Sequence, residues 1–278
     1  MSKHLGYIHS APTRSSRRQN LMGSIFYFVG AIFVPKIFHD SFMPVLRYFR
    51  ALSIVFKDIS ELLYPRFCPG CSGLISPTEK AICLICLSRL EPTGFEFFPK
   101  NNALYYKFAG KIPVEGACSG FFFEKKSLIR TIVHKAKYEN APFLLQTLGF
   151  FWGQRLKLSN FLDQVTELVP IPLHPKKQKA RGYNQAEYLA QGISAATGLP
   201  INTRFLYRAI NTPTQTRKNK IERWENVKAA FACRGRAPKL PLLIDDVITS
   251  GATTEAAALT MHLNGCDNIK IGSLAFVR

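Results

Sequence analysis

The chain has 278 residues, of which 47% are hydrophobic and 20% charged, so it is long and apolar enough for one or two folded domains and is not a disordered chain. Its formal net charge is +19, which favours polyanionic partners such as nucleic acid, phosphorylated ligands or acidic lipid. Seven cysteines at this length do not form the dense pattern of a small disulfide-bonded secreted domain, and a reducing, cytoplasmic compartment is expected.

Residues 1–53 are apolar and basic, and they are predicted to be an N-terminal extension. Arginines precede the uncharged stretch 21–34, which is shorter than the roughly 20 residues that a membrane-spanning helix needs. Between 45 and 63, apolar residues recur at helical spacing with basic residues among them. Three interpretations stay open: a translation start at an internal methionine, a helix that contacts a partner or the inner membrane peripherally through residues 20–57, and a secretion signal. An extension of little catalytic relevance is favoured, and secretion ranks last.

Residues 54–95 are predicted to form a helix followed by a cysteine module. The module contains CPGC at 68–71 and CLIC at 83–86, which are separated by eleven residues. Two such turns can surround one tetrahedral zinc ion with four thiolates, and a site so closed would hold zinc for a structural purpose. The predicted metal ligands are Cys68, Cys71, Cys83 and Cys86. A redox pair is the alternative, but it would need only one C-x-x-C on a βαβ element.

Residues 96–278 are predicted to form an α/β domain. Aromatic and β-branched residues from 103 to 124 suggest a hairpin or short meander, whereas 125–138 carries the apolar stripe of a helix. A second helix is predicted over 142–158, with a proline in its first turn. Strands are then predicted at 167–172, 240–245 and 268–278, and helices at 183–198, 219–231 and 251–265. This alternation implies a parallel sheet covered by helices on both faces.

The most informative stretch is LPLLIDDVITSGATTEA at 240–256, in which an apolar strand pattern leads into two adjacent aspartates and a turn of small and hydroxyl residues. In an open α/β sheet, ligands bind beyond the carboxyl ends of the strands. The amides at the start of the following helix favour a phosphate, and the hydroxyls of the turn can donate to it. Because like charges repel, Asp245 and Asp246 would instead take the hydroxyls of a sugar, or a magnesium ion carried by its other phosphates. A ribose 5-phosphate meets both requirements.

The alternative for this stretch is an aspartate that caps an ordinary helix. One carboxylate would serve as a cap, and a second one after a buried apolar run is costly without a ligand. The turn differs from a Walker loop because no G-K-[ST] follows it. The predicted phosphate-binding turn consists of Thr249, Ser250, Gly251, Ala252 and Thr253.

These motifs resemble known families. LLIDDVITSGATTEA resembles the signature with which type I phosphoribosyltransferases bind 5-phosphoribosyl 1-pyrophosphate (PRPP). VPIPLHPKKQKARGYNQAEYLA at 169–190, TPTQTRKNKIERWENVKAAF at 212–231 and the paired C-x-x-C turns resemble the ComF family, the competence protein F group of bacterial DNA uptake. The resemblance spans about residues 54–278. It implies a type I phosphoribosyltransferase-like parallel sheet flanked by helices, with a small N-terminal four-cysteine zinc ribbon.

The resemblance also implies roles for individual residues. Asp245 and Asp246 would hold the ribose 2- and 3-hydroxyls, and the turn after them the 5-phosphate, with Mg²⁺ bound together with PRPP. The loop after Pro172 would be the pyrophosphate loop. Its phosphate contacts would be Lys176, Lys177, Lys179 and Arg181. A flexible loop that closes over the site would contain Gln215, Arg217 and Arg223.

The sequence therefore predicts a ComF-like protein that binds PRPP or a related ribose 5-phosphate and assists DNA uptake in natural transformation, with single-stranded DNA and uptake proteins as partners. Two alternatives stay open: an active phosphoribosyltransferase of nucleotide metabolism with an unidentified acceptor, and a non-catalytic, zinc-stabilised adaptor. An adaptor would not need the acidic pair. His134 and His174 are candidate acid–base groups, but a helix-face residue and a loop residue are the simpler interpretations. Neither a catalytic residue nor an oligomeric state follows from the sequence.

Overall fold

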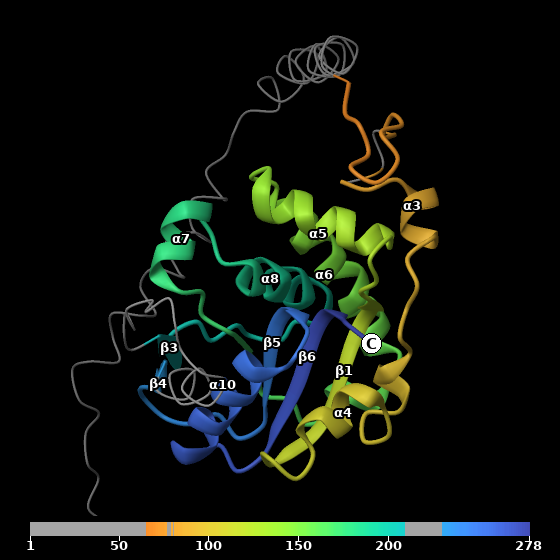
Figure 1. Cartoon of the computed structure of the whole chain (residues 1–278). Helices are drawn as coiled ribbons and strands as arrows, with labels where there is room; N and C mark the ends of the chain where they lie inside the picture. Colours follow the sequence, from red (N-terminus) through yellow and green to blue (C-terminus); the bar gives the residue numbers. More distant parts are fainter. Residues whose placement is uncertain (1–64, 77–78, 80, 209–229) are drawn as a thin grey trace, which may run out of the picture. The chain divides into compact units, whose positions relative to one another are not determined.

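A four-stranded parallel sheet lies at the centre of the computed structural model, which describes residues 65–76, 79, 81–208 and 230–278 (Figure 1). Its strands follow the order β1-β6-β5-β2, and every neighbouring pair is parallel. The strands are β1 (Val114–Phe122), β2 (Glu167–Pro170), β5 (Pro241–Ile248) and β6 (Ile269–Phe276). A separate antiparallel pair consists of β3 (Leu206–Arg208) and β4 (Phe231–Cys233). The predicted parallel sheet flanked by helices is confirmed.

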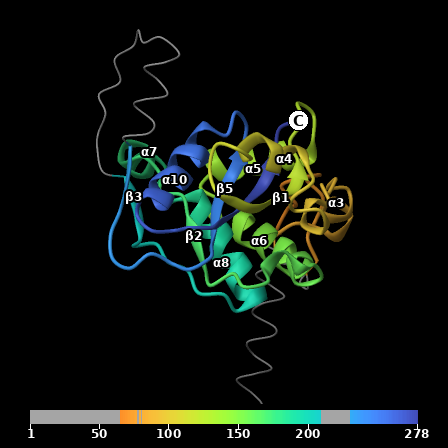
Figure 2. The same cartoon turned by 90° about the horizontal axis from the view of Figure 1, so that it is seen from below.

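Helices cover both faces of the sheet (Figures 1 and 2). One buried cluster joins Leu242 and Ile244 of β5 to α5, α6 and α8, and a second joins Leu243 to α4 and α10. Successive strand residues thus enter opposite cores, as the pleat of a strand requires. The helices are α3 (Leu84–Ser88), α4 (Ala103–Phe108), α5 (Leu128–Tyr138), α6 (Pro142–Lys157), α7 (Pro175–Arg181), α8 (Gln185–Thr197) and α10 (Ala252–Leu263), with short 3-10 turns at Phe95–Phe97 and Asn160–Leu162.

The local signals of several helices act as predicted. Pro142 occupies the first turn of α6, and Gly198 ends α8 with a positive φ of 79°. Helices α6 and α8 then pack very closely, because a Cβ placed on Gly192 would lie 2.0 Å from the backbone oxygen of Gln146. Both helices belong to the buried cluster that covers one face of the sheet.

Two predictions are wrong. The hairpin predicted over 103–124 is instead helix α4 followed by β1, which pairs in parallel with β6. The side chain of Asn102 caps α4 by accepting a hydrogen bond from the amide of Tyr105 at 2.9 Å, and its Nδ2 donates to the carbonyl of Ala117 on β1. A single capping residue thus starts a helix and ties it to the strand, and the aromatic pattern does not show this.

The second wrong prediction concerns the loop after Pro172, which contains helix α7. Pro175 stands in its first turn, the Nδ1 of His174 accepts from the amide of Lys176 at 3.2 Å, and Gly182 closes the helix with a φ of 78°. The sequence of α7, PKKQKAR, has no apolar stripe, and none of its residues is buried. Apolar periodicity therefore could not predict this helix. In addition, β5 is longer than predicted and contains both aspartates.

Some predictions fall on residues that the structure does not describe. These include the N-terminal extension, the membrane contact through 20–57 and the helix preceding the cysteine module. The helix predicted over 219–231 lies outside the described residues up to 229, and Phe231 belongs to β4. Among the described residues, no helix has both the length and the apolar character to cross a membrane.

Candidate functional site

The two adjacent aspartates lie near the carboxyl end of β5, and their carboxylates are fixed by short hydrogen bonds. Oδ1 of Asp245 accepts from the amide of Asp246 at 2.8 Å, and Oδ2 accepts from the hydroxyl of Thr254 on α10 at 3.1 Å. Oδ1 of Asp246 accepts from the amide of Val247 at 2.7 Å. Its other oxygen, Oδ2, lies 2.6 Å from the Nζ of Lys137 on α5. Strand, following helix and a helix from earlier in the chain therefore position the pair together.

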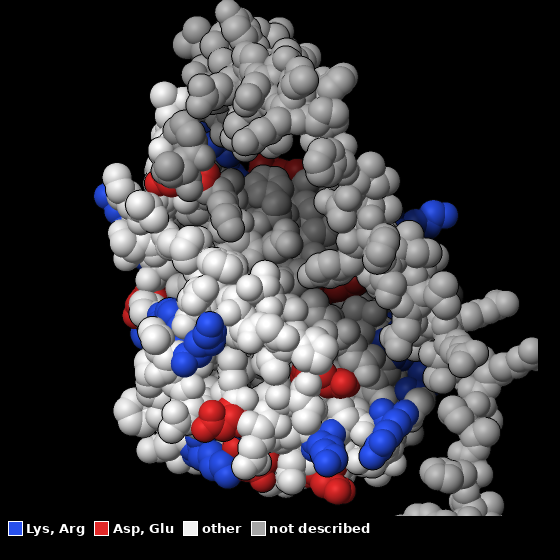
Figure 3. Space-filling model, turned by 180° about the vertical axis from the view of Figure 1, so that it is seen from behind, with Lys and Arg blue, Asp and Glu red and all other residues white. Residues whose placement is uncertain are grey.

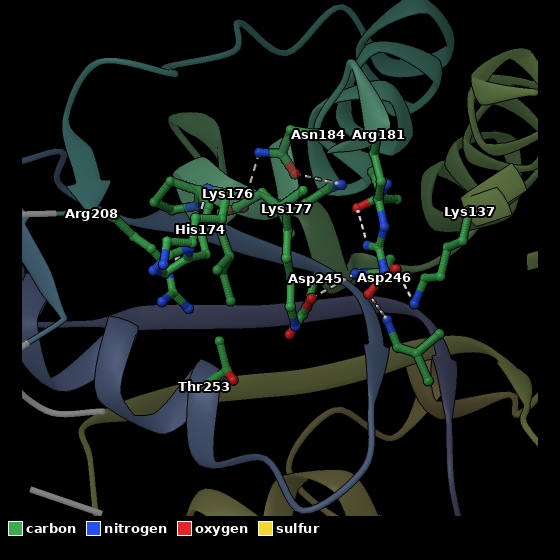
Figure 4. A pocket seen from close by; sticks show the side chains of 16 residues that line it. Lys137, His174, Lys176, Lys177, Arg181, Asn184, Arg208, Asp245, Asp246 and Thr253 are labelled. Carbon is green, nitrogen blue, oxygen red and sulfur yellow. Dashed lines mark hydrogen bonds and ion pairs between the residues drawn. The ribbon is translucent and has the colours of Figure 1, made fainter. Parts of the chain in front are cut away.

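The carboxylates face a pocket of about 530 Å³, here called the acidic-pair pocket. Its lining comes from α5, the β2–α7 connection, α7, α8, β3, β5 and the first turn of α10 (Figure 4). The charged and titratable lining residues are Lys137, His174, Lys176, Lys177, Arg181, Arg208, Asp245 and Asp246, and the others include Asn184, Gln185 and Thr253. Figure 4 shows Lys137 at the Asp246 side of the pocket, while His174, Lys176 and Arg208 gather at the opposite side. Cations therefore flank both ends of the acidic pair.

The pocket brings together part of the predicted phosphate contacts. Lys176, Lys177 and Arg181 line it, whereas Lys179, on the same helix, does not. Of the predicted turn, Thr253 lines the pocket, and the remaining four residues, Thr249, Ser250, Gly251 and Ala252, are not part of its lining. The turn does end at a helix, since α10 begins at Ala252 after Gly251, whose φ is 82°. The predicted flexible-loop residues Gln215, Arg217 and Arg223 lie outside the described residues.

Sequence reasoning missed Lys137, Asn184, Gln185 and Arg208. Asn184 caps α8 by accepting from the amide of Ala186, and its Nδ2 donates to the carbonyl of Ile171 at 3.0 Å. The Oε1 of Gln185 accepts from Arg181 at 3.0 Å. The RGYNQ stretch thus forms one wall of the pocket, and Asn184 joins the start of α8 to the residue that follows β2. The RGYNQ motif itself was the sequence signal that could have identified Asn184 and Gln185.

Arg208 approaches the pocket from the small antiparallel pair. Its Nε donates to the carbonyl of Pro172 at 3.3 Å, and its guanidinium lies over the ring of Phe231, 4.8 Å from the centroid. Burial lowers the pKa of Arg208, and the nearby Asp245 opposes this effect. Burial also lowers the pKa of His174, and the positive charges of Arg208, Lys176 and Lys177 lower it further. This end of the pocket is therefore built to receive negative charge.

Burial and the adjacent charge of Asp246 raise the pKa of Asp245 to about 7, although the Asp246 amide, Thr254 and Lys137 all oppose the shift. A carboxyl so perturbed inside a pocket is typical of a functional site. Hydroxyl donors from a ligand would favour its ionised form and would compensate for the lost hydration.

The four predicted cysteine ligands converge in a second site. Their Sγ atoms all lie within 4.8 Å of one another, and those of Cys71 and Cys83 are 3.8 Å apart. Four thiolates around one zinc ion, with Zn–S of about 2.3 Å, would be about 3.8 Å from each other in a tetrahedron. The amides of Gly70 and Cys83 each point at the Sγ of Cys68 from 3.4 Å. The cluster could therefore hold a zinc ion, with amide donors stabilising the thiolates.

Burial raises the pKa of Cys68, but backbone donors from Cys83, Cys71 and Gly70 outweigh it and bring the pKa to about 6.

The cysteine module also packs against α5. A Cβ placed on Gly70 would lie 2.9 Å from Cδ1 of Leu128, and a cavity of about 420 Å³ is lined by Cys68 of the module and by Lys135 of α5.

Curated relatives of the chain come from bacteria. Competence protein F of Haemophilus influenzae is 28% identical over 163 residues, which are 56% of this chain and 70% of that protein. Competence protein ComFC of Streptococcus pneumoniae is 25% identical over 210 residues, 72% of this chain and 90% of that protein. DNA utilization protein YhgH of Salmonella typhimurium is 26% identical, and the match spans 51% of this chain and 65% of that protein. The resemblance to competence protein F is therefore confirmed, while no protein-family profile matches the chain.

Solved structures overlap more weakly. Adenine phosphoribosyltransferase from Leishmania tarentolae is 12% identical with a TM-score of 0.33, over 67% of this chain and 94% of that one. Glutamine PRPP amidotransferase from B. subtilis is 16% identical with a TM-score of 0.33, over 48% of this chain and 26% of that one. At these TM-scores the overlaps carry no argument, and the strand order and the pocket stand on their own.

Proposed function

We propose that the chain binds PRPP, or a closely related ribose 5-phosphate, in the acidic-pair pocket, and that it assists DNA uptake as a ComF-like protein. One observation supports the ligand above all: two adjacent carboxylates, Asp245 and Asp246, share a pocket with several cations from separate elements. A ligand must then offer hydroxyl donors to the acids and phosphate oxygens to the cations. A phosphorylated ribose offers both within one small molecule.

In this proposal the ribose hydroxyls donate to the two aspartates, and the pyrophosphate lies toward Lys176, Lys177 and Arg208. The 5-phosphate lies at the start of α10 beside Thr253, where the helix dipole and free amides favour an anion. A magnesium ion bound with PRPP would be held by the ligand phosphates, and it would neutralise phosphate charge. The zinc ion proposed for the four cysteines has a structural role only, since four protein ligands close its coordination sphere.

The ligand assignment is tested by calorimetric titration with PRPP, ribose 5-phosphate and pyrophosphate. The double variant Asp245→Asn/Asp246→Asn keeps the shape of the pocket but removes both charges, and it should lose ribose phosphate binding. Asp267→Asn, at an exposed position outside the pocket, is the matched control. Equal affinity of the double variant and the unchanged protein would refute the assignment.

The role in DNA uptake rests on the competence relatives and on the net charge of +19. On the face shown in Figure 3, the Lys and Arg side chains of described residues are scattered among Asp and Glu, so the described residues form no broad basic patch there. Binding to single-stranded DNA should weaken steeply as salt rises, because phosphate contacts release counterions. Absence of binding at low salt would remove the nucleic-acid part of the proposal and leave the ligand part intact.

Phosphoribosyl transfer is the second candidate function for the same pocket. The cations near Arg208 and α7 favour it, because a departing pyrophosphate needs them to stabilise its developing charge. Release of pyrophosphate from PRPP, measured with Mg²⁺ and with or without single-stranded DNA, distinguishes an enzyme from a binding protein.

A further inference from the structure

Lys137 contacts the acidic pair from a helix that the ribose phosphate motif does not include. It lies in the last turn of α5, four residues after Val133 and eight after Ile129, both of which are buried. This spacing places Lys137 on the helix face that enters the core. Its side chain is 21% exposed and that of Asp246 is 15% exposed, so the pair is largely shielded from water.

The contact uses the one Asp246 oxygen that the backbone leaves free. Oδ1 of Asp246 already accepts from the amide of Val247, and Oδ2 lies 2.6 Å from the Nζ of Lys137. A divalent cation could use Oδ2 as an inner ligand only by competing with this ammonium, which repels it. Lys137 also lines the pocket, and an ammonium has three N–H donors, of which Asp246 takes one.

We propose that Lys137 is the resident cation of the acidic pair: it donates to a ribose hydroxyl of the ligand and makes a divalent metal beside Asp246 unnecessary for ribose binding. This inference rests on the proposed function. A hydroxyl that donates to the Asp246 carboxylate can accept from the same ammonium, so carboxylate, hydroxyl and ammonium form a closed set of charge-assisted hydrogen bonds. A metal carried by the pyrophosphate of PRPP is a separate ion and is unaffected.

The test uses ribose 5-phosphate as the probe, because it lacks a pyrophosphate that would bind metal by itself. Its affinity for the full chain is measured by calorimetry with EDTA and with Mg²⁺, for the unchanged protein and for Lys137→Met, Lys137→Arg and Lys179→Met. Lys179→Met removes the same charge outside the pocket lining and is the matched control.

The unchanged protein and Lys179→Met should bind equally well with EDTA and with Mg²⁺. Lys137→Met should bind about tenfold or more weakly in EDTA, the effect of losing a charge-assisted hydrogen bond, and Mg²⁺ should restore part of the loss. Lys137→Arg should retain most of the affinity in EDTA. Melting temperatures of all variants show whether a loss of binding comes from unfolding, and rescue by Mg²⁺ would itself demonstrate a folded pocket.

Two results would overturn the inference about Lys137 alone: binding by the unchanged protein that requires Mg²⁺, or Lys137→Met binding as the unchanged protein does in EDTA. If the unchanged protein binds neither ribose 5-phosphate nor PRPP, both in EDTA and in Mg²⁺, the proposed function fails, and the inference about Lys137 fails with it.

Discussion

The hydroxyl of Thr254, in the first turn of α10, donates a hydrogen bond to Oδ2 of Asp245 on β5 at 3.1 Å. Thr254 is 1% exposed, so this bond joins strand and helix away from water. The acid that is proposed to bind ribose is thereby fixed to the helix whose start is proposed to bind the 5-phosphate. This bond links the two halves of the site directly, in addition to the packing of α10 against β5.

Replacing Thr254 with Val keeps the shape of the side chain but removes the donor. We expect ribose 5-phosphate to bind about tenfold more weakly, because a buried carboxylate that loses a hydrogen bond is harder to keep ionised. Thr254→Ser retains the hydroxyl and should bind nearly as the unchanged protein does. Calorimetric titration above pH 8 makes the comparison, and equal affinity for all three proteins would show that the bond does not matter for the ligand.

The raised pKa of Asp245 should make the stability of the protein depend on pH. Its pKa is about 7 in the folded chain and close to the ordinary value of about 3.9 in the unfolded chain. Between these values the folded state holds a proton that the unfolded state has released, so the contribution of Asp245 to stability falls as pH rises from about 4 to about 7, and it is constant above. Asp245→Asn has no such proton.

The melting temperature of Asp245→Asn, relative to that of the unchanged protein, should therefore increase from pH 5 to pH 8. Taking the difference at each pH cancels the titration of all other groups that the substitution leaves unchanged. A difference that is the same at both pH values would contradict the raised pKa.

The two exposed lysines of α7 should distinguish PRPP from ribose 5-phosphate. Lys176→Met/Lys177→Met removes two charges from the end of the pocket assigned to pyrophosphate, so PRPP affinity should fall severalfold while ribose 5-phosphate affinity changes less. Solvent screens exposed lysines, which limits the loss. Lys179→Met, from the same helix, serves as control. A similar loss for both ligands would place the pyrophosphate elsewhere.

Loss of the cysteine site should affect both metal content and stability. Cys68→Ser/Cys83→Ser removes two of four thiolates, and we expect zinc content to fall from about one per chain to almost none and the melting temperature to fall with it. Cys233→Ser changes a thiol outside the cluster and should keep the zinc. Elemental analysis and thermal unfolding measure the two effects, and zinc retained by the double variant would exclude this ligand set.

The sequence predicted those parts of the site that are continuous along the chain. The acidic pair and Thr253, which line the pocket, and the four cysteines, which converge, each occupy one or two short stretches, so residue types and spacing were enough to single them out. Among the described helices, α5, α6, α8 and α10 were also predicted, since they have apolar stripes or clear end signals.

What could not be predicted depends on contacts between distant segments. Arg208 enters the pocket only because β3 pairs with β4, across more than twenty intervening residues. Lys137 reaches Asp246 because β1, β6 and β5 adopt one order that places α5 beside the end of β5. The sequence did hold one clue to Lys137: a lysine at a position where the apolar stripe of α5 would continue.

Helix α5 contacts the cysteine module at one end and the acidic pair at the other, so a change in the module can affect the pocket. Leu128 at its start bears on the cysteine module, and Lys137 near its end bears on Asp246. Eleven residues of helix extend about 16 Å, so this one helix connects the cysteine turns to the Asp246 end of the acidic-pair pocket. Deletion of the cysteine module would remove the contact that supports the start of α5. A related chain without the four cysteines would need other contacts that support the start of α5, so that Lys137 keeps its position beside Asp246.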